Sequence, residues 1–261
     1  MFDVAARVSQ SLKSTALVLG RAQRKDNGPP DIFVLGSGVV VAPEVVLTSN
    51  HINYASADLY SSLNVFVGSD HTYDPAEDSL YCHPVTTFSA DGPRDLLLMR
   101  VPGLPSTPVA LRKQDPNLGE LLYWIGHPGP HKMQMAPIVA SGCVAAKQFV
   151  PHFPRGVSTA VRGLRLDGSA LGGNSGGGAF DQNGLLCGLI CASPLQVSER
   201  HLSTLVASQN GGQGLIGGVD VVGVLRGLLE ELYSTTRPGI AYAVGVEEIQ
   251  AALPTLLQRL P

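Results

Sequence analysis

Three short segments, far apart in the chain, carry the residue types that nucleophilic catalysis needs. His51 ends the run VVVAPEVVLTSNH, Asp95 opens the apolar run DLLLMRV, and Ser175 lies within LGGNSGGGAF. A histidine accepts a proton near neutral pH. A carboxylate can orient that histidine, and a hydroxyl beside it becomes a nucleophile. These types in this order indicate acyl transfer by a serine, histidine and aspartate acting together.

Each of these residues also has a structural interpretation. A lone histidine is usually structural, and an aspartate before an apolar strand is often an ordinary turn residue. Asp91 is an alternative to Asp95, but no apolar strand follows it directly. His127, in the turn GHPGP, is interpreted as structural. The combination of the three segments, rather than any one of them, favours catalysis.

The glycines around Ser175 suit the chemistry expected of this loop. Because glycine has no side chain, the backbone can turn tightly and a substrate can approach closely. Such a turn can also direct successive backbone N–H groups at one point, which the oxyanion of an acyl-transfer transition state requires. A flexible Gly/Ser loop is the alternative, and the apolar runs on both sides of the segment disfavour it.

Short apolar runs bounded by glycine, proline and polar turns dominate the chain, and this rhythm predicts an all-β sandwich or a pair of barrels. A helix is expected over about 2–12, and two more over 221–233 and about 246–260. The predicted strands cover 15–19, 32–35, 39–47, 63–68, 85–88, 96–101, 121–125, 138–146, 161–166, 178–180, 185–192 and 240–244.

Composition narrows the classes of function. With 44% hydrophobic and 15% charged residues and a formal charge of −3, the chain offers no electrostatic reason to expect nucleic acid as a partner. No run of 18 apolar residues is present, so we expect no membrane span. The oligomeric state is left open, and a homo-oligomer remains compatible with the sequence.

The four cysteines, Cys82, Cys143, Cys187 and Cys191, form neither a C-x-x-C pair nor a zinc-type cluster with histidine. We interpret them as small buried hydrophobes and expect no disulfide framework. Cys187 and Cys191 are four apart on a predicted strand and should therefore face the same side of the sheet. Without a secretory signal at the N-terminus either, the expected location is cytoplasmic.

The segments GSGVVVAPEVVLTSNH, DLLLMRV and GGNSGGGAF resemble the His, Asp and Ser segments of trypsin-like serine proteases. The HtrA/Deg branch is the nearer match, since LGELLYWIGHPGP, IVASGCVAA and GIAYAVGVEEIQ also resemble its later strands and closing helix. The N-terminal DVAARVSQSLKSTALVLG resembles the branch's first helix and strand, so the resemblance covers about residues 3–255.

This resemblance implies a chymotrypsin-like fold of two six-stranded antiparallel β-barrels in one protease domain, 1–261. The first barrel is expected over about 14–110 and the second over about 118–245, followed by a closing helix over 246–261 and no PDZ module. It also implies a catalytic triad of His51, Asp95 and Ser175. An oxyanion hole would form from the backbone N–H groups of Gly173 and Ser175, with Asn174 between them. We expect a polypeptide substrate and no cofactor or metal.

Some positions depart from the digestive trypsins. Ile52 stands where those enzymes have a cysteine after the histidine, and Asn174 where they have a buried aspartate before the serine. The first departure argues against a disulfide-stapled secreted enzyme, and the second against activation by a newly cut N-terminus. Gly178 replaces the usual proline, a change that should leave the chemistry untouched.

Counting from Ser175, the resemblance places the base of the primary specificity pocket at Ser169, with Ala170 beside it. Cys191, Ala192 and Ser193 should line its wall. Without a carboxylate at the base, a buried Arg or Lys side chain of the substrate would lack a partner. We therefore expect cleavage after small or aliphatic uncharged residues, unless a shifted loop brings Asp167 into the pocket. The predicted function is a serine endopeptidase; a catalytically latent binding module and an esterase using the same residues are the alternatives.

Overall fold

The computed structural model describes residues 4–22, 31–52, 62–67, 83–105, 107–128, 137–150, 161–192, 215–216, 219–220 and 239–260. The helix expected over 221–233, Cys82 and Ser193 lie outside the described residues.

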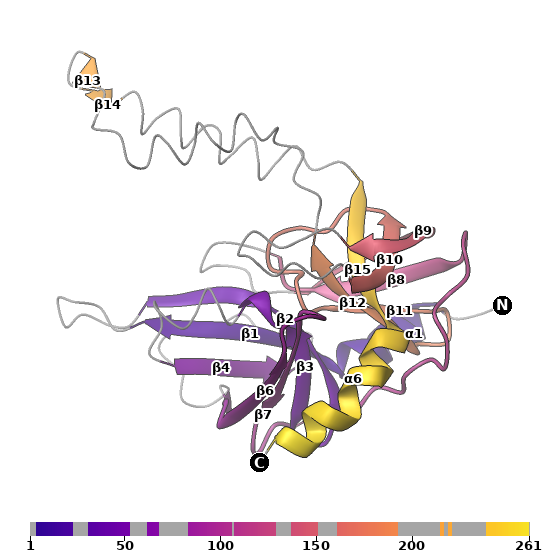
Figure 1. The fold of residues 1–261 in the computed structure, drawn as a ribbon. Helices are drawn as coiled ribbons and strands as arrows, with labels where there is room; N and C mark the ends of the chain where they lie inside the picture. Colours follow the sequence, from indigo (N-terminus) through magenta and orange to yellow (C-terminus); the bar gives the residue numbers. More distant parts are fainter. Residues whose placement is uncertain are drawn as a thin grey trace.

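The described elements are mostly strands (Figure 1). In chain order they are α1 (Val4–Leu12), β1 (Thr15–Ala22), β2 (Asp31–Ala42), β3 (Val45–Ser49), β4 (Ser62–Val67), β5 (His83–Pro84), β6 (Thr87–Asp91), β7 (Leu96–Arg100), β8 (Leu121–Gly126), β9 (Ile138–Val150), β10 (Val161–Asp167), β11 (Gly178–Phe180), β12 (Leu186–Ala192), β13 (Leu215–Ile216), β14 (Val219–Asp220), β15 (Ile240–Gly245) and α6 (Val246–Arg259).

The N-terminal half forms a seven-stranded antiparallel sheet in the order β5-β4-β1-β2-β3-β7-β6. Its edge strands β5 and β6 are separated by only two residues of chain, so the sheet must curl until its two edges approach each other. β3 is buried at all five positions and β7 at its first four, and each of the two strands is paired on both sides within the sheet.

The C-terminal half forms a closed barrel in the order β10-β15-β12-β11-β8-β9, with antiparallel pairs throughout. Trp124, Leu164 and Leu166 are fully buried inside it with smaller residues such as Ala179 and Ala243. β13 and β14 make a separate two-stranded pair. The predicted all-β, two-barrel fold is confirmed, with the difference that the first barrel is a curled sheet of seven strands.

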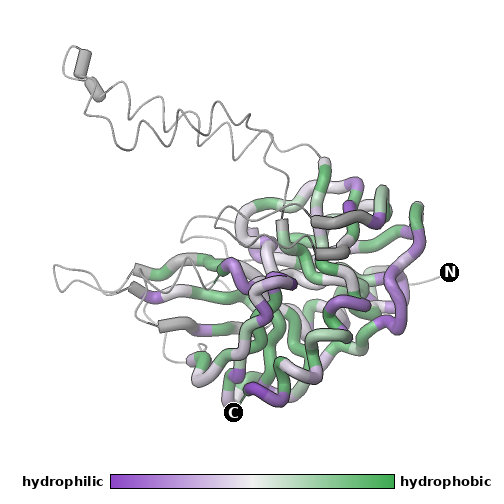
Figure 2. The backbone as a smooth tube through the Cα atoms, in the orientation of Figure 1, coloured by the Kyte–Doolittle hydropathy of each residue, from purple (hydrophilic) through white to green (hydrophobic). Residues whose placement is uncertain are grey.

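The closing helix α6 packs against both halves (Figure 1). Its buried residues Ile249, Ala252 and Leu256 join one apolar cluster with Leu98 of β7 and Phe180 of β11. Figure 2 shows long hydrophobic stretches along the strands, with hydrophilic stretches in several of the connections between them. Neither described helix has the length and apolar character that crossing a bilayer requires.

The chain between the two halves also holds the start of α6. The helix begins after Gly245, which offers no side-chain cap. Asp115, from the connection between β7 and β8, supplies one: its Oδ1 accepts the Glu247 N–H at 3.1 Å. The Glu247 carboxylate in turn accepts the Asp115 N–H at 3.3 Å. This reciprocal pair is a capping box made between distant segments.

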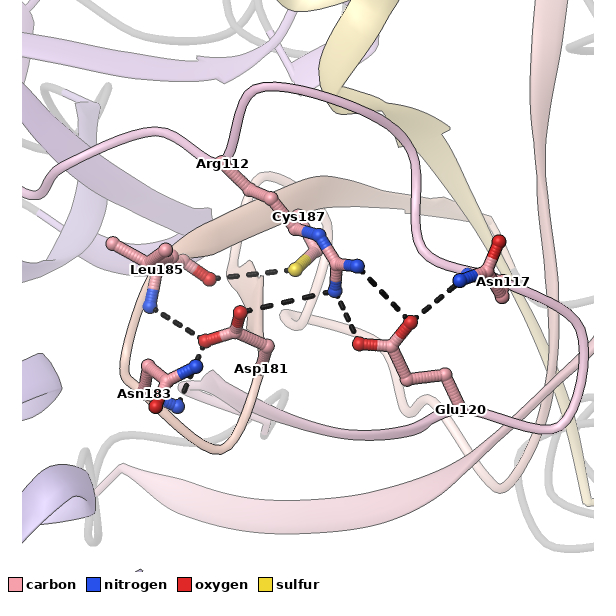
Figure 3. Close-up of polar contacts among 7 residues, drawn as sticks. All are labelled: Arg112, Asn117, Glu120, Asp181, Asn183, Leu185 and Cys187. Carbon is pink, nitrogen blue, oxygen red and sulfur yellow. Dashed lines mark hydrogen bonds and ion pairs between the residues drawn. The ribbon is translucent and has the colours of Figure 1, made fainter.

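A second polar cluster fixes the same connection to the C-terminal barrel (Figure 3). The Arg112 guanidinium binds both carboxylate oxygens of Glu120 and lies 3.8 Å from Asp181 Oδ2. The hydrogen bond from Arg112 lowers the pKa of Glu120. Beside this cluster, burial raises the pKa of the Cys187 thiol to about 12.

One expectation about the cysteines is wrong. Cys187 packs inside the C-terminal barrel, whereas Cys191 belongs to the cluster that α6 covers. The cause is a register shift against β11, where Ala179 pairs with Gly188 but Phe180 pairs with Leu186 and Cys187 is the extra residue, because an extra residue in a strand exchanges the faces that follow it. Cys143, Cys187 and Cys191 are all free thiols.

Candidate active site

Strand register brings His51 to Asp95. β3 and β7 pair antiparallel with Ser49 opposite Leu96, so the residues just after β3 meet the residue just before β7. The Asn50 N–H donates to the Asp95 carbonyl at 2.9 Å. The Asp95 carboxylate then contacts His51 twice: Oδ1 accepts the backbone N–H at 2.8 Å, and Oδ2 lies 2.8 Å from ring Nδ1.

Because an ionised carboxylate can only accept, this contact places the ring proton of His51 on Nδ1 and leaves Nε2 as the basic nitrogen. The His51 side chain is 28% exposed and that of Asp95 only 8% exposed. The imidazole therefore reaches the surface while the carboxylate behind it is shielded.

Asp95 has a left-handed backbone, with φ of 56°. Aspartate tolerates this region better than most residues. The preceding turn is held by Arg94, which binds Asp91 at 2.9 Å and Glu248 of α6 at 2.8 Å. Asp91, the alternative to Asp95 in the sequence, is thus a partner of Arg94, and the carboxylate that contacts His51 is that of Asp95.

The loop around Ser175 is a tight double turn. The Asn174 N–H donates to the Leu171 carbonyl at 3.0 Å, and the Gly177 N–H donates to the Asn174 carbonyl at 2.9 Å. Gly173 and Gly176 have φ of 95° and 84°, which side-chain-bearing residues rarely adopt. A Cβ on Gly173 would lie 2.3 Å from the His127 carbonyl oxygen, so this glycine also permits a close approach of two backbones.

Contacts with β3 bring this loop to the strand that ends near His51. The Gly176 N–H donates to the Ile190 carbonyl at 2.6 Å, and the Ser49 hydroxyl donates to the same oxygen at 3.2 Å. A Cβ on Gly176 would lie 3.0 Å from the Ser49 nitrogen and 2.1 Å from Thr48 Oγ1. The residue after Ser175 therefore packs directly on the strand that presents His51.

The three residues expected at the oxyanion hole differ in how their N–H groups are used. The Asn174 N–H is occupied by Leu171 inside the turn. Among the described residues, the N–H groups of Gly173 and Ser175 donate no backbone hydrogen bond outside regular elements. Of the three expected N–H groups, the Asn174 N–H is thus the one already used inside the turn.

The segment expected at the base of the specificity pocket lies over Trp124. The indole N–H donates to the Ser169 carbonyl at 3.2 Å, and a Cβ on Gly168 would lie 2.4 Å from the indole ring. Ser169 is exposed and Ala170 is buried. Ser169 Oγ faces Gly239, at 4.0 Å from the position of a Cβ there.

The expected wall lies on β12. Cys191 is buried, and its thiol donates to the Tyr242 carbonyl at 3.5 Å. Ala192 pairs with Tyr242 at the end of the strand, and Ser193 lies outside the described residues. Asp167 pairs with Ile240 at the end of β10 and is exposed. Among the described residues, no group of three or more His, Cys, Asp or Glu is placed to hold a metal ion.

Sequence reasoning missed Ser37, which contacts the backbone of His127. The Ser37 hydroxyl accepts the His127 backbone N–H at 2.8 Å and donates to the Gly173 carbonyl at 2.8 Å. The available signal for Ser37 was a serine between two glycines, ahead of an apolar run. Burying a polar side chain in a strand is costly unless it has a hydrogen-bond partner, so this serine could have been expected to have one.

Comparison with known proteins agrees with this architecture. The family model described as "Trypsin-like peptidase domain" matches residues 36–189, more than half of the chain. Because of this match, the chain belongs to the trypsin-like peptidase family, and it is a serine protease by class. No curated protein matches the sequence.

Solved structures share the fold at low sequence identity. The active form of the Rv3671c protease from M. tuberculosis superposes with a TM-score of 0.64 at 14% identity, covering 98% of this chain and 84% of that one. An inactive form of the same protease gives 0.60 at 14% identity, with 96% and 92% covered. The HtrA-type protease AlgW with a decapeptide gives 0.65 at 15% identity, with 98% and 68% covered. The resemblance to the HtrA branch is thereby confirmed at the level of the fold.

Proposed function

We propose that this chain is an active serine endopeptidase with Ser175 as nucleophile, His51 as general base and Asp95 as the residue that orients the base. The paired contact of Asp95 with His51, at 2.8 Å to both the ring and the backbone nitrogen, is the observation that carries the proposal. A carboxylate in this position holds the imidazole in one tautomer and stabilises the imidazolium that forms during the reaction.

In the first half of the reaction, Ser175 Oγ attacks the carbonyl carbon of the scissile peptide and its proton passes to His51 Nε2. The carbonyl oxygen becomes an oxyanion, which accepts hydrogen bonds from the N–H groups of Gly173 and Ser175. The tetrahedral species collapses when the C–N bond breaks, and His51 returns the proton to the departing amine. An acyl group remains on Ser175.

In the second half, water replaces the amine. His51 removes a proton from the water as it attacks the acyl carbon, and the ester bond to Ser175 breaks with return of that proton to the serine oxygen. The products are a carboxylic acid and the free hydroxyl. The peptide substrate and one water molecule are the reactants that balance the two halves.

The preferred residue before the cut is proposed to be small or aliphatic and uncharged. The expected pocket segment offers the exposed Ser169, the buried Ala170 and the apolar Cys191. None of these supplies a negative charge, and a buried cation without a partner is costly.

Labelling with a fluorophosphonate probe tests the nucleophile. The wild type should be modified at Ser175, located by peptide mass mapping, and Ser175→Ala should remain unlabelled and turn over peptide on the order of a million-fold more slowly. A folded wild type that resists the probe would contradict activity and leave a latent binding module. Rapid hydrolysis of a simple ester with no cleavage of casein would instead identify an esterase.

A peptide panel that varies only the residue before the cut tests the preference. Alanine, valine or leucine at that position should give the highest kcat/KM. Efficient cleavage after arginine would overturn the proposed specificity without touching the proposed nucleophile.

A further inference from the structure

Ser37 connects the N-terminal sheet to the loop that carries Ser175. It lies on β2, between two glycines, and is fully buried. A hydroxyl has one hydrogen to donate and lone pairs to accept with, and the Ser37 hydroxyl uses both. It donates to the Gly173 carbonyl at 2.8 Å and accepts the His127 N–H at 2.8 Å.

The backbone of Ser37 also contacts the Ser175 loop, at Ser175 and Gly176. Its N–H donates to the Ser175 carbonyl at 2.7 Å. Its carbonyl oxygen accepts the Thr48 hydroxyl at 2.6 Å and lies 2.1 Å from the position of a Cβ on Gly176. One residue of the first half of the chain therefore contacts Gly173, Ser175 and Gly176 of the second half.

These contacts restrict the Ser175 loop at Gly173, where no side chain limits the backbone conformation. Gly173 has no side chain to restrict its dihedral angles, and its φ of 95° is one of several conformations open to glycine. The Ser37 hydroxyl is bonded to its carbonyl, which restricts the rotation of the Gly173–Asn174 peptide plane. The other fixed point, at the Ser175 carbonyl, depends on the backbone of Ser37 and would survive loss of the hydroxyl.

We propose that the Ser37 hydroxyl is a positioning element for the oxyanion hole. By holding the peptide between Gly173 and Asn174 it restricts rotation about the Cα–C bond of Gly173, and thereby the direction of the Gly173 N–H on the other side of the same α-carbon. The inference rests on the proposed function in that the oxyanion is the one formed by attack of Ser175. Ser37 touches no reacting atom. Its hydroxyl acts on the loop through the Gly173 carbonyl, and it also accepts the His127 N–H at 2.8 Å and lies 3.5 Å from His127 Nδ1.

Ser37→Ala tests this by removing one oxygen atom. In the variant the Gly173 carbonyl loses its donor and the loop can adopt alternatives. We expect kcat per active site, counted by fluorophosphonate titration, to fall about 10- to 100-fold while KM changes less than about threefold. Affinity for a peptide boronate, which forms a tetrahedral adduct on the serine, should fall in parallel with kcat.

Ser14→Ala is the matched control. Ser14 is also buried in the N-terminal half, and its hydroxyl also donates to one carbonyl, that of Thr107, at 2.5 Å. The same exchange there should leave kcat per titrated site within about threefold of wild type. Unchanged kcat in Ser37→Ala, or equal losses in the two variants, would overturn the positioning role. If Ser37→Ala does not fold, Ser37→Cys, which keeps most of the volume but donates weakly, enters the same comparison.

Hydrogen exchange separates failure of this inference from failure of the proposed function. Amides of residues 172–177 should exchange faster in Ser37→Ala than in wild type and Ser14→Ala, whether or not the wild type is active. A wild type that resists the probe, with this difference present, would refute the peptidase and keep the positioning role. Equal exchange in this loop in all three proteins would refute the positioning role.

Discussion

The Asp95 carboxylate holds His51 by two atoms at once, the ring Nδ1 and the backbone nitrogen, each at 2.8 Å. Fixing the backbone as well as the ring limits both the position and the rotation of the imidazole. Asp95 can do this because its left-handed φ of 56° turns the side chain back toward the end of β3.

Asp95→Asn should separate the electrostatic role of this residue from its structural one. Asparagine tolerates the left-handed region and can keep one of the two contacts, but its NH₂ cannot accept the Nδ1 proton. We expect kcat to fall about 10⁴-fold, the loss known for this exchange in another serine protease triad. Asp95→Ala should be less stable than Asp95→Asn by about 1 kcal/mol in urea unfolding, because alanine is strained at this φ. Equal activity of Asp95→Asn and wild type would show that the charge is dispensable.

Gly176→Ala should destabilise the protein far more than the same exchange at Gly119. Both glycines have a positive φ, at 84° and 77°. A Cβ at Gly176 would lie 2.1 Å from both the Ser37 carbonyl and Thr48 Oγ1, whereas nothing lies within 4 Å of one at Gly119. Dihedral strain alone predicts about 1 kcal/mol for Gly119→Ala. Backbone overlap raises the loss for Gly176→Ala to about 3 kcal/mol or more. Denaturant unfolding of the two variants measures the difference, and similar losses would contradict the close packing of the loop on β2 and β3.

Ser169→Asp should redirect cleavage toward basic residues if Ser169 forms the base of the specificity pocket. A carboxylate there would give an Arg or Lys side chain the partner that the wild-type pocket lacks. We expect kcat/KM for a peptide with Arg before the cut to rise at least about tenfold relative to the matched Val peptide. Asp167 is already a carboxylate two residues away, so Asp167→Asn is the control and should leave the ratio unchanged. A shift in the ratio from Asp167→Asn instead would place the pocket base at that residue.

The buried Cys187 thiol should make stability fall at alkaline pH. Burial, with the nearby Asp181 charge, raises its pKa from 9.0 to about 12. Because the thiol loses its proton at lower pH in the unfolded chain, the stabilisation is complete below pH 9.0 and is lost as pH rises toward 12. Between about pH 8 and about pH 10.5, wild type should lose about 2 kcal/mol more stability than Cys187→Ala in urea unfolding. Parallel pH profiles of the two proteins would refute the shift. The cavity left in Cys187→Ala lowers the free energy of unfolding of the variant by a similar amount at every pH. It therefore does not affect the comparison of the two slopes.

Much of the fold could be predicted because its signals are local. Short apolar runs with turn residues at their ends gave the positions of β7, β11 and β15 to within a few residues, whereas the strand predicted over 39–47 crosses the turn between β2 and β3. The helix predicted over about 246–260 corresponds to α6, whose buried positions repeat every three to four residues. The prediction for Cys187 and Cys191 failed because the register shift between β11 and β12 at Cys187 leaves no mark in residue type.

The same distinction between local features and tertiary contacts applies to the active site. The residue types, their order and the glycines around Ser175 are properties of the chain itself, and they limit the chemistry to nucleophilic catalysis. Which aspartate meets His51 depends on the register of β3 against β7, and the support of the Ser175 loop by Ser37 depends on packing between the two halves. Contacts between residues more than a hundred positions apart arise from burial of apolar surface over the whole domain, which no local pattern encodes. The sequence alone therefore determined the elements and the candidate chemistry, and only the tertiary structure decided which groups touch.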